Sequence, residues 1–412
     1  KVRVLIVKVL SSHGFGKVIE ILEKSQARQD VDCNTYKRCG GCNLRHVKYE
    51  ETLKMKQNAV QSLVNKTLKN KLQIKETVGM ENPLHYRNKA QYPIGINKQG
   101  EPVIGVFANR THEVIPIDNC LIQNKKSEEI AKFIIEFIKE KNISIYDEKK
   151  GKGLVRHIVT KVGIKTGEIM CVIVINGHKI PNENELVENL KTRYPEIKAI
   201  VKNINMKNTN VILGQENINL YGNGYIEDIL GEYKFKISPL SFYQVNPVQA
   251  EKLYNLGVSM AEITKNDVVF DLYCGIGTIS LFMSKFAKKV YGIEIVEEAV
   301  KMAKENAQNN NVSNTEFFAG DVEIVLDDLI NNKGLKADVV MFDPPRKGLD
   351  KKSIDNILNI RPKKIVYISC NPATLIRDLA DFENEYDIKT IIPVDMFPFT
   401  SHVECVATLQ LK

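Results

Sequence analysis

The C-terminal part of the chain alternates short apolar runs with segments of helical periodicity, and this pattern restricts the fold more than any other feature. Five runs are expected to be strands: 268–272, 290–295, 316–319, 339–342 and 365–369. Between two of them, Ala299, Met302 and Ala303 recur at the spacing of one helix face. The pattern predicts an open, mainly parallel α/β sheet. Two later β-like runs, 390–395 and 402–409, predict an antiparallel final pair.

The rest of the chain differs in pattern, and 412 residues are too many for one ordinary core. We expect four parts: a partial β segment over 1–30, a cysteine loop with a basic helix over 31–75, an α+β domain over 76–245 and the α/β domain over 246–412. In the first part the runs 2–9 and 16–22 are expected to pair. In the third, strands at 156–162, 169–175 and 199–203 mix with helices at 128–141 and 183–192.

Composition and charge indicate a non-membrane, cytoplasmic protein with a polyanionic partner. The chain is 43% hydrophobic and 26% charged, and no apolar stretch approaches membrane-spanning length. Of the net charge of +8, residues 1–75 supply +10, from sixteen Lys and Arg against six Asp and Glu. Such a concentration of positive charge favours nucleic acid, although a solvated lysine-rich surface is an alternative.

Three cysteines follow the pattern C-x5-C-x2-C, at Cys33, Cys39 and Cys42, with two glycines between the last pair. In a reducing compartment such a cluster predicts a metal site rather than disulfides. A fourth ligand must come from elsewhere, and Cys120 is the best placed by default. Sulfur-only ligation allows zinc or an iron–sulfur cluster, and the spacing favours a cluster only slightly.

A glycine-containing turn, Asp271-Leu-Tyr-Cys-Gly-Ile-Gly-Thr278, follows the first strand of the α/β domain. Its glycines, Gly275 and Gly277, would let a ligand approach the backbone. Ser280 stands where a dinucleotide-binding loop has its third glycine or alanine, which argues against NAD.

Acidic residues follow the next three strands, and ligands bind at the carboxyl ends of parallel strands. Glu294 is placed to bind ribose hydroxyls, Asp321 to meet an adenine edge, and Asp343 to reach the same crevice. An aspartate there can equally cap a helix. The combination of the glycine turn with acidic residues at the ends of three strands indicates an adenosyl cofactor.

Cys370 ends the last parallel strand in the sequence Ser-Cys-Asn-Pro. Pro372 is typical of a first helical turn, whose free N–H groups would favour a reactive thiolate. A buried structural cysteine is the alternative. Glu404 is a charged residue on an otherwise apolar final strand, and its presence there requires an explanation. The simplest explanation is an ion pair on the protein surface.

The segment from Tyr86 to Tyr92 interleaves cations, amides and rings. This arrangement suits single-stranded RNA, although an ordinary amphipathic strand is the alternative.

Together these motifs resemble the RNA uracil-5-methyltransferase family over nearly the whole chain. The matching motifs are CGGC at 39–42, FYQVN at 242–246, DLYCGIGT at 271–278, DPPR at 343–346, SCNP at 369–372 and HVE at 402–404. The resemblance is strongest to the cysteine-cluster branch, whose best-known members methylate bacterial 23S ribosomal RNA. It implies a class I S-adenosylmethionine-dependent methyltransferase domain, of Rossmann-like architecture, and an opening segment similar to the second half of a TRAM (OB-like) barrel.

The resemblance also implies roles for individual residues. A [4Fe–4S] cluster would be held by Cys33, Cys39, Cys42 and Cys120. S-adenosylmethionine would be bound by Gln244, Tyr273, Gly275, Gly277, Thr278, Glu294, Asp321 and Asp343. Cys370 would be the nucleophile and Glu404 the base, because C5 of uracil attacks a methyl group only after a thiolate adds to C6, and the C5 proton must then be removed.

Three alternatives remain open at this point. The RNA could be a transfer RNA. The enzyme could methylate an amino group through the DPPR loop, which would not require Cys370. The chain could be a metal-containing RNA-binding module without catalysis. No membrane and no obligate protein partner is expected.

Overall fold

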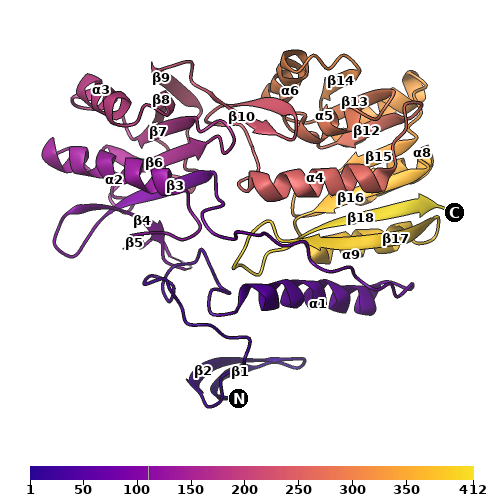
Figure 1. The fold of residues 1–412 in the computed structure, drawn as a ribbon, viewed down its shortest axis with the longest axis horizontal. Helices are drawn as coiled ribbons and strands as arrows, with labels where there is room; N and C mark the ends of the chain where they lie inside the picture. The colour runs from indigo at the N-terminus through magenta and orange to yellow at the C-terminus, as the bar shows by residue number, and fades with distance from the viewer. Residues whose placement is uncertain (110) are drawn as a thin grey trace.

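The computed structural model describes residues 1–109 and 111–412, and two seven-stranded sheets organise most of them (Figure 1). The strands of the C-terminal sheet are β12 (Val268–Leu272), β13 (Lys289–Glu294), β14 (Thr315–Ala319), β15 (Val339–Phe342), β16 (Lys364–Ser369), β17 (Tyr386–Val394) and β18 (Glu404–Leu411). Their spatial order is β14-β13-β12-β15-β16-β18-β17. The first five are parallel, and β18 runs antiparallel to both β16 and β17. The expected sheet and its antiparallel final pair are confirmed.

Helices cover both faces of this sheet, which explains why its central strands are mostly apolar. One core contains α4 (Pro247–Ala261), α5 (Thr278–Ser284) and α6 (Glu297–Asn309). The opposite core contains α7 (Val322–Asp327), α8 (Lys351–Ile360) and α9 (Pro372–Phe382), joined by α1 (Tyr49–Thr67), which packs against α9. A π-helical turn, Asp328–Asn332, follows α7. The layers form the α/β class that the sequence predicts.

The central sheet has the order β5-β4-β3-β6-β7-β8-β9. Its strands are β3 (Lys89–Ile96), β4 (Pro102–Phe107), β5 (Val114–Pro116), β6 (Val155–Val162), β7 (Ile169–Ile175), β8 (Ile197–Ile204) and β9 (Glu216–Tyr221). Helices α2 (Lys125–Glu140) and α3 (Glu183–Arg193) cover one face. The other face contributes Val159, Met170 and Val172 to a core shared with the hairpin of β10 (Ile226–Leu230) and β11 (Tyr233–Ile237) and with α4.

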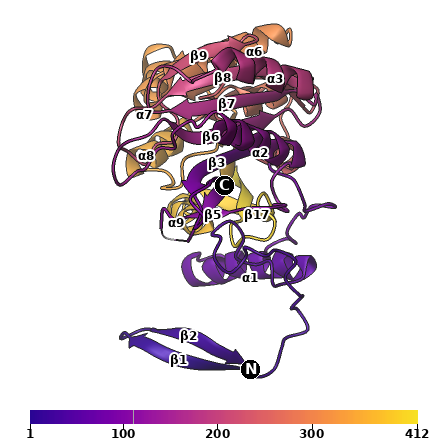
Figure 2. The same cartoon turned by 90° about the vertical axis from the view of Figure 1, so that its left-hand side faces the viewer.

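Strands β1 (Val2–Val9) and β2 (Gly14–Ile21) pair as an antiparallel hairpin, as the sequence predicts. The hairpin stands apart from the two sheets (Figures 1 and 2). Its apolar side chains are exposed, Val9 by 73% and Val7 by 67%. Over the described part of the chain, no helix combines the length and the apolarity that crossing a bilayer requires.

The segment from Tyr86 to Tyr92 does not present its aromatic rings to solvent. Tyr86 and Tyr92 are both buried, and the Tyr86 hydroxyl donates to the carbonyl oxygen of Pro398. The expectation of a stacking surface for RNA bases is therefore wrong for these rings. Residues 89–92 lie in β3, whose alternate side chains pack under α2, so the amphipathic-strand alternative describes the segment.

Candidate active site

The turn between β12 and α5 has an unusual backbone conformation. Tyr273, Gly275 and Gly277 all have positive φ angles, of 65°, 56° and 79°. A Cβ at Gly277 would lie 3.0 Å from the ring of Phe317, so a larger residue would crowd this turn. At Gly275, no described atom beyond the two chain neighbours lies within 4 Å of the position that a Cβ would take, so that side of the turn is open to a ligand.

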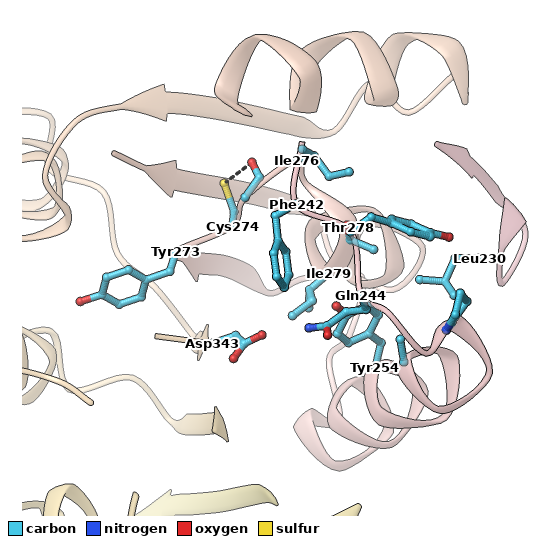
Figure 3. A pocket seen from close by; sticks show the side chains of 14 residues that line it. Leu230, Phe242, Gln244, Tyr254, Tyr273, Cys274, Ile276, Thr278, Ile279 and Asp343 are labelled. Atoms are coloured by element: carbon cyan, nitrogen blue, oxygen red, sulfur yellow. Dashed lines mark hydrogen bonds between the residues drawn. The ribbon is translucent and has the colours of Figure 1, made fainter. Parts of the chain in front are cut away.

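A pocket of about 500 Å³, part of it open to solvent, lies at this turn (Figure 3). It sits between the ends of β12 and β15, where the strand order reverses, which is the usual ligand position in such sheets. Of the residues expected to bind the cofactor, Gln244, Tyr273, Gly275, Thr278 and Asp343 line it. Sequence reasoning assigned no role to Phe242 or Tyr254, which also line the pocket.

Glu294 and Asp321 lie at the same edge of the sheet but do not line this pocket. Glu294 ends β13 and accepts a hydrogen bond of 3.1 Å from the backbone N–H of Gly275, which links it to the turn. Asp321 caps α7 by accepting from the N–H of Glu323. The structure therefore brings Glu294 to the glycine turn. Asp321 makes the helix-capping contact that the sequence left open as an alternative to ligand binding.

Asp271 and Ser280 form a buried pair beneath the turn. The Ser280 hydroxyl donates to one carboxylate oxygen of Asp271, and among the described residues the other oxygen has no hydrogen-bond partner. Burial raises the pKa of Asp271 to about 7. This contact gives Ser280 a specific role where a dinucleotide site would carry glycine or alanine.

Cys370 and Glu404 are brought together by the antiparallel pairing of β16 with β18. The last paired residues are Ser369 and Cys405, so Cys370 and Glu404 are the next positions on the two neighbouring strands. Asp343 follows β15, the other neighbour of β16. Three side chains with acid–base or nucleophilic chemistry thus share one end of the sheet.

Glu404 is only 4% exposed, and within the described residues no group donates to its Oε2 atom. Burial is the main cause that raises its pKa to about 8, and the nearby Asp343 carboxylate adds to the effect. Burial also raises the pKa of Asp343. The surface ion pair that was the alternative for Glu404 is therefore excluded, and its Oε2 atom, unpartnered among the described residues, can accept a proton.

The thiol of Cys370 is partly buried, and its pKa is raised rather than lowered. Burial is the largest cause, followed by the carboxylates of Glu404 and Asp343, while Arg346 acts in the opposite direction. The helix start is as expected, with Asn371 capping α9 and Pro372 in its first turn. The expectation of a thiolate held ionised by the helix is wrong, because burial and two acidic neighbours outweigh the helix terminus.

Cys33, Cys39, Cys42 and Cys120 line a second pocket, of about 630 Å³. Burial and the neighbouring Cys120, Cys39 and Cys33 raise the pKa of Cys42 to about 12. Residues 1–109 and 111–412 contain no group of three or more His, Cys, Asp or Glu arranged to hold a metal ion. The structure thus gathers the predicted cysteines around one cavity without placing them at the distances of a single-ion site.

The sheet order, the glycine turn and the pocket at the switch point define a class I S-adenosylmethionine-dependent methyltransferase. The structure resembles that of the Pyrococcus abyssi tRNA (uracil-54, C5)-methyltransferase in complex with S-adenosyl-L-homocysteine, with a TM-score of 0.77 and 28% identity over 99% of this chain and 91% of that one.

Residues 48–412 match the tRNA (uracil-5-)-methyltransferase family, and the chain belongs to this family. It is 49% identical to an uncharacterised RNA methyltransferase of Clostridium acetobutylicum, over 100% of this chain and 90% of that protein. It is 48% identical to an uncharacterised RNA methyltransferase of Caldanaerobacter subterraneus, over 96% and 87%. The protein is therefore a methyltransferase that uses S-adenosylmethionine and acts on RNA.

Proposed function

We propose that this protein methylates C5 of a uridine in 23S ribosomal RNA through a covalent bond to Cys370. The observation that carries the proposal is the position of Cys370 beside a buried carboxylate, Glu404, at the end of the sheet that also holds the cofactor pocket. An amino-group methyltransferase would need neither residue.

The chemistry assigns each residue a task. S-adenosylmethionine, when bound, supplies an electrophilic methyl group. The Cys370 sulfur bonds to C6 of uracil, and the electron pair of the C5–C6 double bond becomes available at C5 for the methyl group. Glu404 then takes the proton from C5, the double bond re-forms, and the bond between C6 and sulfur breaks.

The thiol must lose its proton before it adds to the ring. Asp343 and Glu404 both have raised pKa values and both influence the thiol, so two carboxyl groups near it can exchange protons close to neutral pH. Arg346 favours the thiolate once it forms. We assign Gln244, Tyr273, Gly275, Gly277, Thr278, Glu294, Asp321 and Asp343 to cofactor binding.

For the cysteine pocket we propose a [4Fe–4S] cluster rather than zinc. Sulfur ligands of one zinc ion lie about 2.3 Å from it, which requires a tight group. A cluster spreads four thiolates over several iron atoms, so its ligands need not converge on one point, and these four cysteines line one cavity. The proposed use of these cysteines as metal ligands, rather than as disulfides, fits a reducing, cytoplasmic location.

Iron and acid-labile sulfide analysis of anaerobically purified protein tests this assignment. We expect both elements in the wild type and their loss in Cys39→Ser, with Cys171→Ser, whose side chain lies in the core of β7, as the matched control. A preparation that contains zinc without iron or sulfide would overturn the cluster.

Transfer RNA is the second candidate substrate, because the structurally similar Pyrococcus abyssi protein is a tRNA methyltransferase. Mapping of 5-methyluridine in total RNA, from cells with and without the protein, separates the two. We expect a site in 23S ribosomal RNA to lose its methyl group when the protein is absent. Loss confined to transfer RNA would favour the second candidate, and no loss in any RNA would contradict the proposed function.

A further inference from the structure

The segment from Asp395 to Ser401 connects β17 to the strand that carries Glu404, and other parts of the chain hold it at almost every residue. Donors from outside the segment reach the carboxylate or backbone oxygens of Asp395, Met396, Phe397 and Pro398. These donors are Lys56 and Tyr49 of α1, Tyr86, Asn246 and Gln249. The approach to Glu404 is therefore fixed by packing and hydrogen bonds rather than left as a free loop.

The second half of this segment is held by the cysteine loop. Directly after Cys42, the side chain of Asn43 donates to the Ser401 hydroxyl and accepts from the Ser401 N–H, both at 2.8 Å. The Leu44 N–H donates to the Phe399 carbonyl oxygen at 2.9 Å. The Arg45 guanidinium lies 4.0 Å from the centre of the Phe399 ring.

Phe399 has a backbone conformation that needs such support. Its φ angle is 63°, in the left-handed region that aromatic residues rarely adopt, and its side chain is only 4% exposed. A residue held there costs free energy that the surrounding structure must supply. Arg45 is itself buried and fixed by a bidentate pair with Asp32, so it offers a rigid surface for the ring.

We propose that Asn43 and Arg45 are positioning residues that fix Glu404 through Phe399 and Ser401. Ser401 lies three residues before Glu404, and β18 begins at Glu404 itself. The position of the segment from Asp395 to Ser401 therefore determines where the first residue of β18 lies. The cysteine loop thereby sets the geometry of proton removal from C5, while Cys370 is held separately by β16 and α9. This inference rests on the proposed role of Glu404.

The test compares formation and breakdown of the covalent RNA adduct in Asn43→Ala and Arg45→Lys. We expect breakdown to slow about tenfold, because a small displacement of a catalytic group costs this much or more. Adduct formation should slow less, because Asp343 can also accept the thiol proton, and S-adenosylmethionine affinity should stay unchanged. Asn43→Asp should restore much of the rate, since a carboxylate can accept from both the N–H and the hydroxyl of Ser401. Asn65→Ala, an exposed change on α1, is the matched control.

Backbone amide hydrogen exchange gives a readout that needs no catalysis. Exchange at Phe399 to Ser401 should accelerate in Asn43→Ala and not in Asn65→Ala. Unchanged exchange, or equal slowing of adduct formation and breakdown in proportion to a lower melting temperature, would overturn the positioning role. If the wild type forms no adduct, the proposed function fails instead, and the exchange result still decides whether the contact holds the segment.

Discussion

Glu404, the base of the proposed mechanism, occupies a position that costs the fold stability. A carboxyl group buried without a full set of partners is destabilising when it is charged, and this one lies at the start of an apolar strand. The pKa of Glu404 is raised because burial destabilises the charged form of the carboxyl group. The same property makes the group a suitable base near neutral pH, because a base works best when its pKa is close to the working pH.

Glu404→Gln should change how stability depends on pH. The pKa of Glu404 is raised from 4.5 to about 8 by folding, so the folded state binds this proton more tightly, and stability is lost as pH rises from about 4.5 through 8. An amide removes this loss. At pH 9 we expect Glu404→Gln to unfold at a higher temperature than the wild type, by calorimetry, with Glu385→Gln unchanged; equal melting temperatures would contradict the buried charge.

Cys370→Ala and Cys171→Ala should have opposite effects. Cys370 is the proposed nucleophile, so its loss should abolish methyl transfer. Because the residue is only partly buried, the melting temperature should stay unchanged. Cys171 is fully buried on β7, so its truncation should cost about 1 kcal/mol of unfolding free energy and preserve activity. Transfer of labelled methyl groups to RNA measures the activity of each variant, and denaturant unfolding measures its stability. Activity in Cys370→Ala would favour a mechanism without the thiol.

At the scale of elements, a buried ion pair anchors helix α1 to the segment from Asp395 to Ser401. Lys56 is 2% exposed, and its ammonium lies 2.5 Å from the carboxylate of Asp395, which is fully buried and also accepts from Tyr49. Such a pair is costly to break on one side only, because the remaining charge is left without its partner.

Lys56→Met should therefore destabilise the protein by about 3 to 5 kcal/mol. Asp395→Asn combined with Lys56→Met should recover much of this loss, since no buried charge remains. Urea unfolding measures both variants, and Lys54→Met, which breaks only an exposed pair with Glu51, should cost little. A small effect of Lys56→Met alone would show that α1 does not depend on this contact.

Elements with a strong apolar signal could be predicted from the sequence and others could not. The run 268–272 and the run 339–342 match β12 and β15, because strands buried on both faces consist almost entirely of apolar residues. The side chains of strand β9 are exposed or partly exposed, so its sequence has no apolar run and does not predict a strand. The motifs located Cys370 and Glu404, but the direction of the thiol pKa depends on burial and on Asp343, which only tertiary structure supplies.

At the scale of the whole molecule, positive charge and the exposed hairpin lie at the same end of the chain. Residues 1–75 carry the net positive charge, and the hairpin of β1 and β2 stands apart from both sheets (Figure 2). Lys8 and Lys17 are exposed on its two strands. This end is therefore expected to meet RNA phosphates away from the catalytic crevice.

Lys8→Gln with Lys17→Gln should lower the salt dependence of RNA binding. Removing one lysine–phosphate interaction reduces the slope of log affinity against log salt by about 0.7 for a single strand, so the slope should fall by up to about 1.4. Filter binding across a salt series measures it. Lys301→Gln with Lys304→Gln on α6 is the control of equal charge, and an equal fall in both double variants would show that the effect is not local.

The most direct test uses RNA that carries 5-fluorouridine at the methylated position. Because fluorine at C5 cannot leave as a proton does, the ring should remain bonded to the enzyme after methyl transfer. We predict a protein–RNA species that survives denaturation, with the mass addition on the peptide that contains Cys370, and none with Cys370→Ala. Methylation of ordinary RNA without any such species, or the same species in Cys370→Ala, would contradict the covalent role of this sulfur.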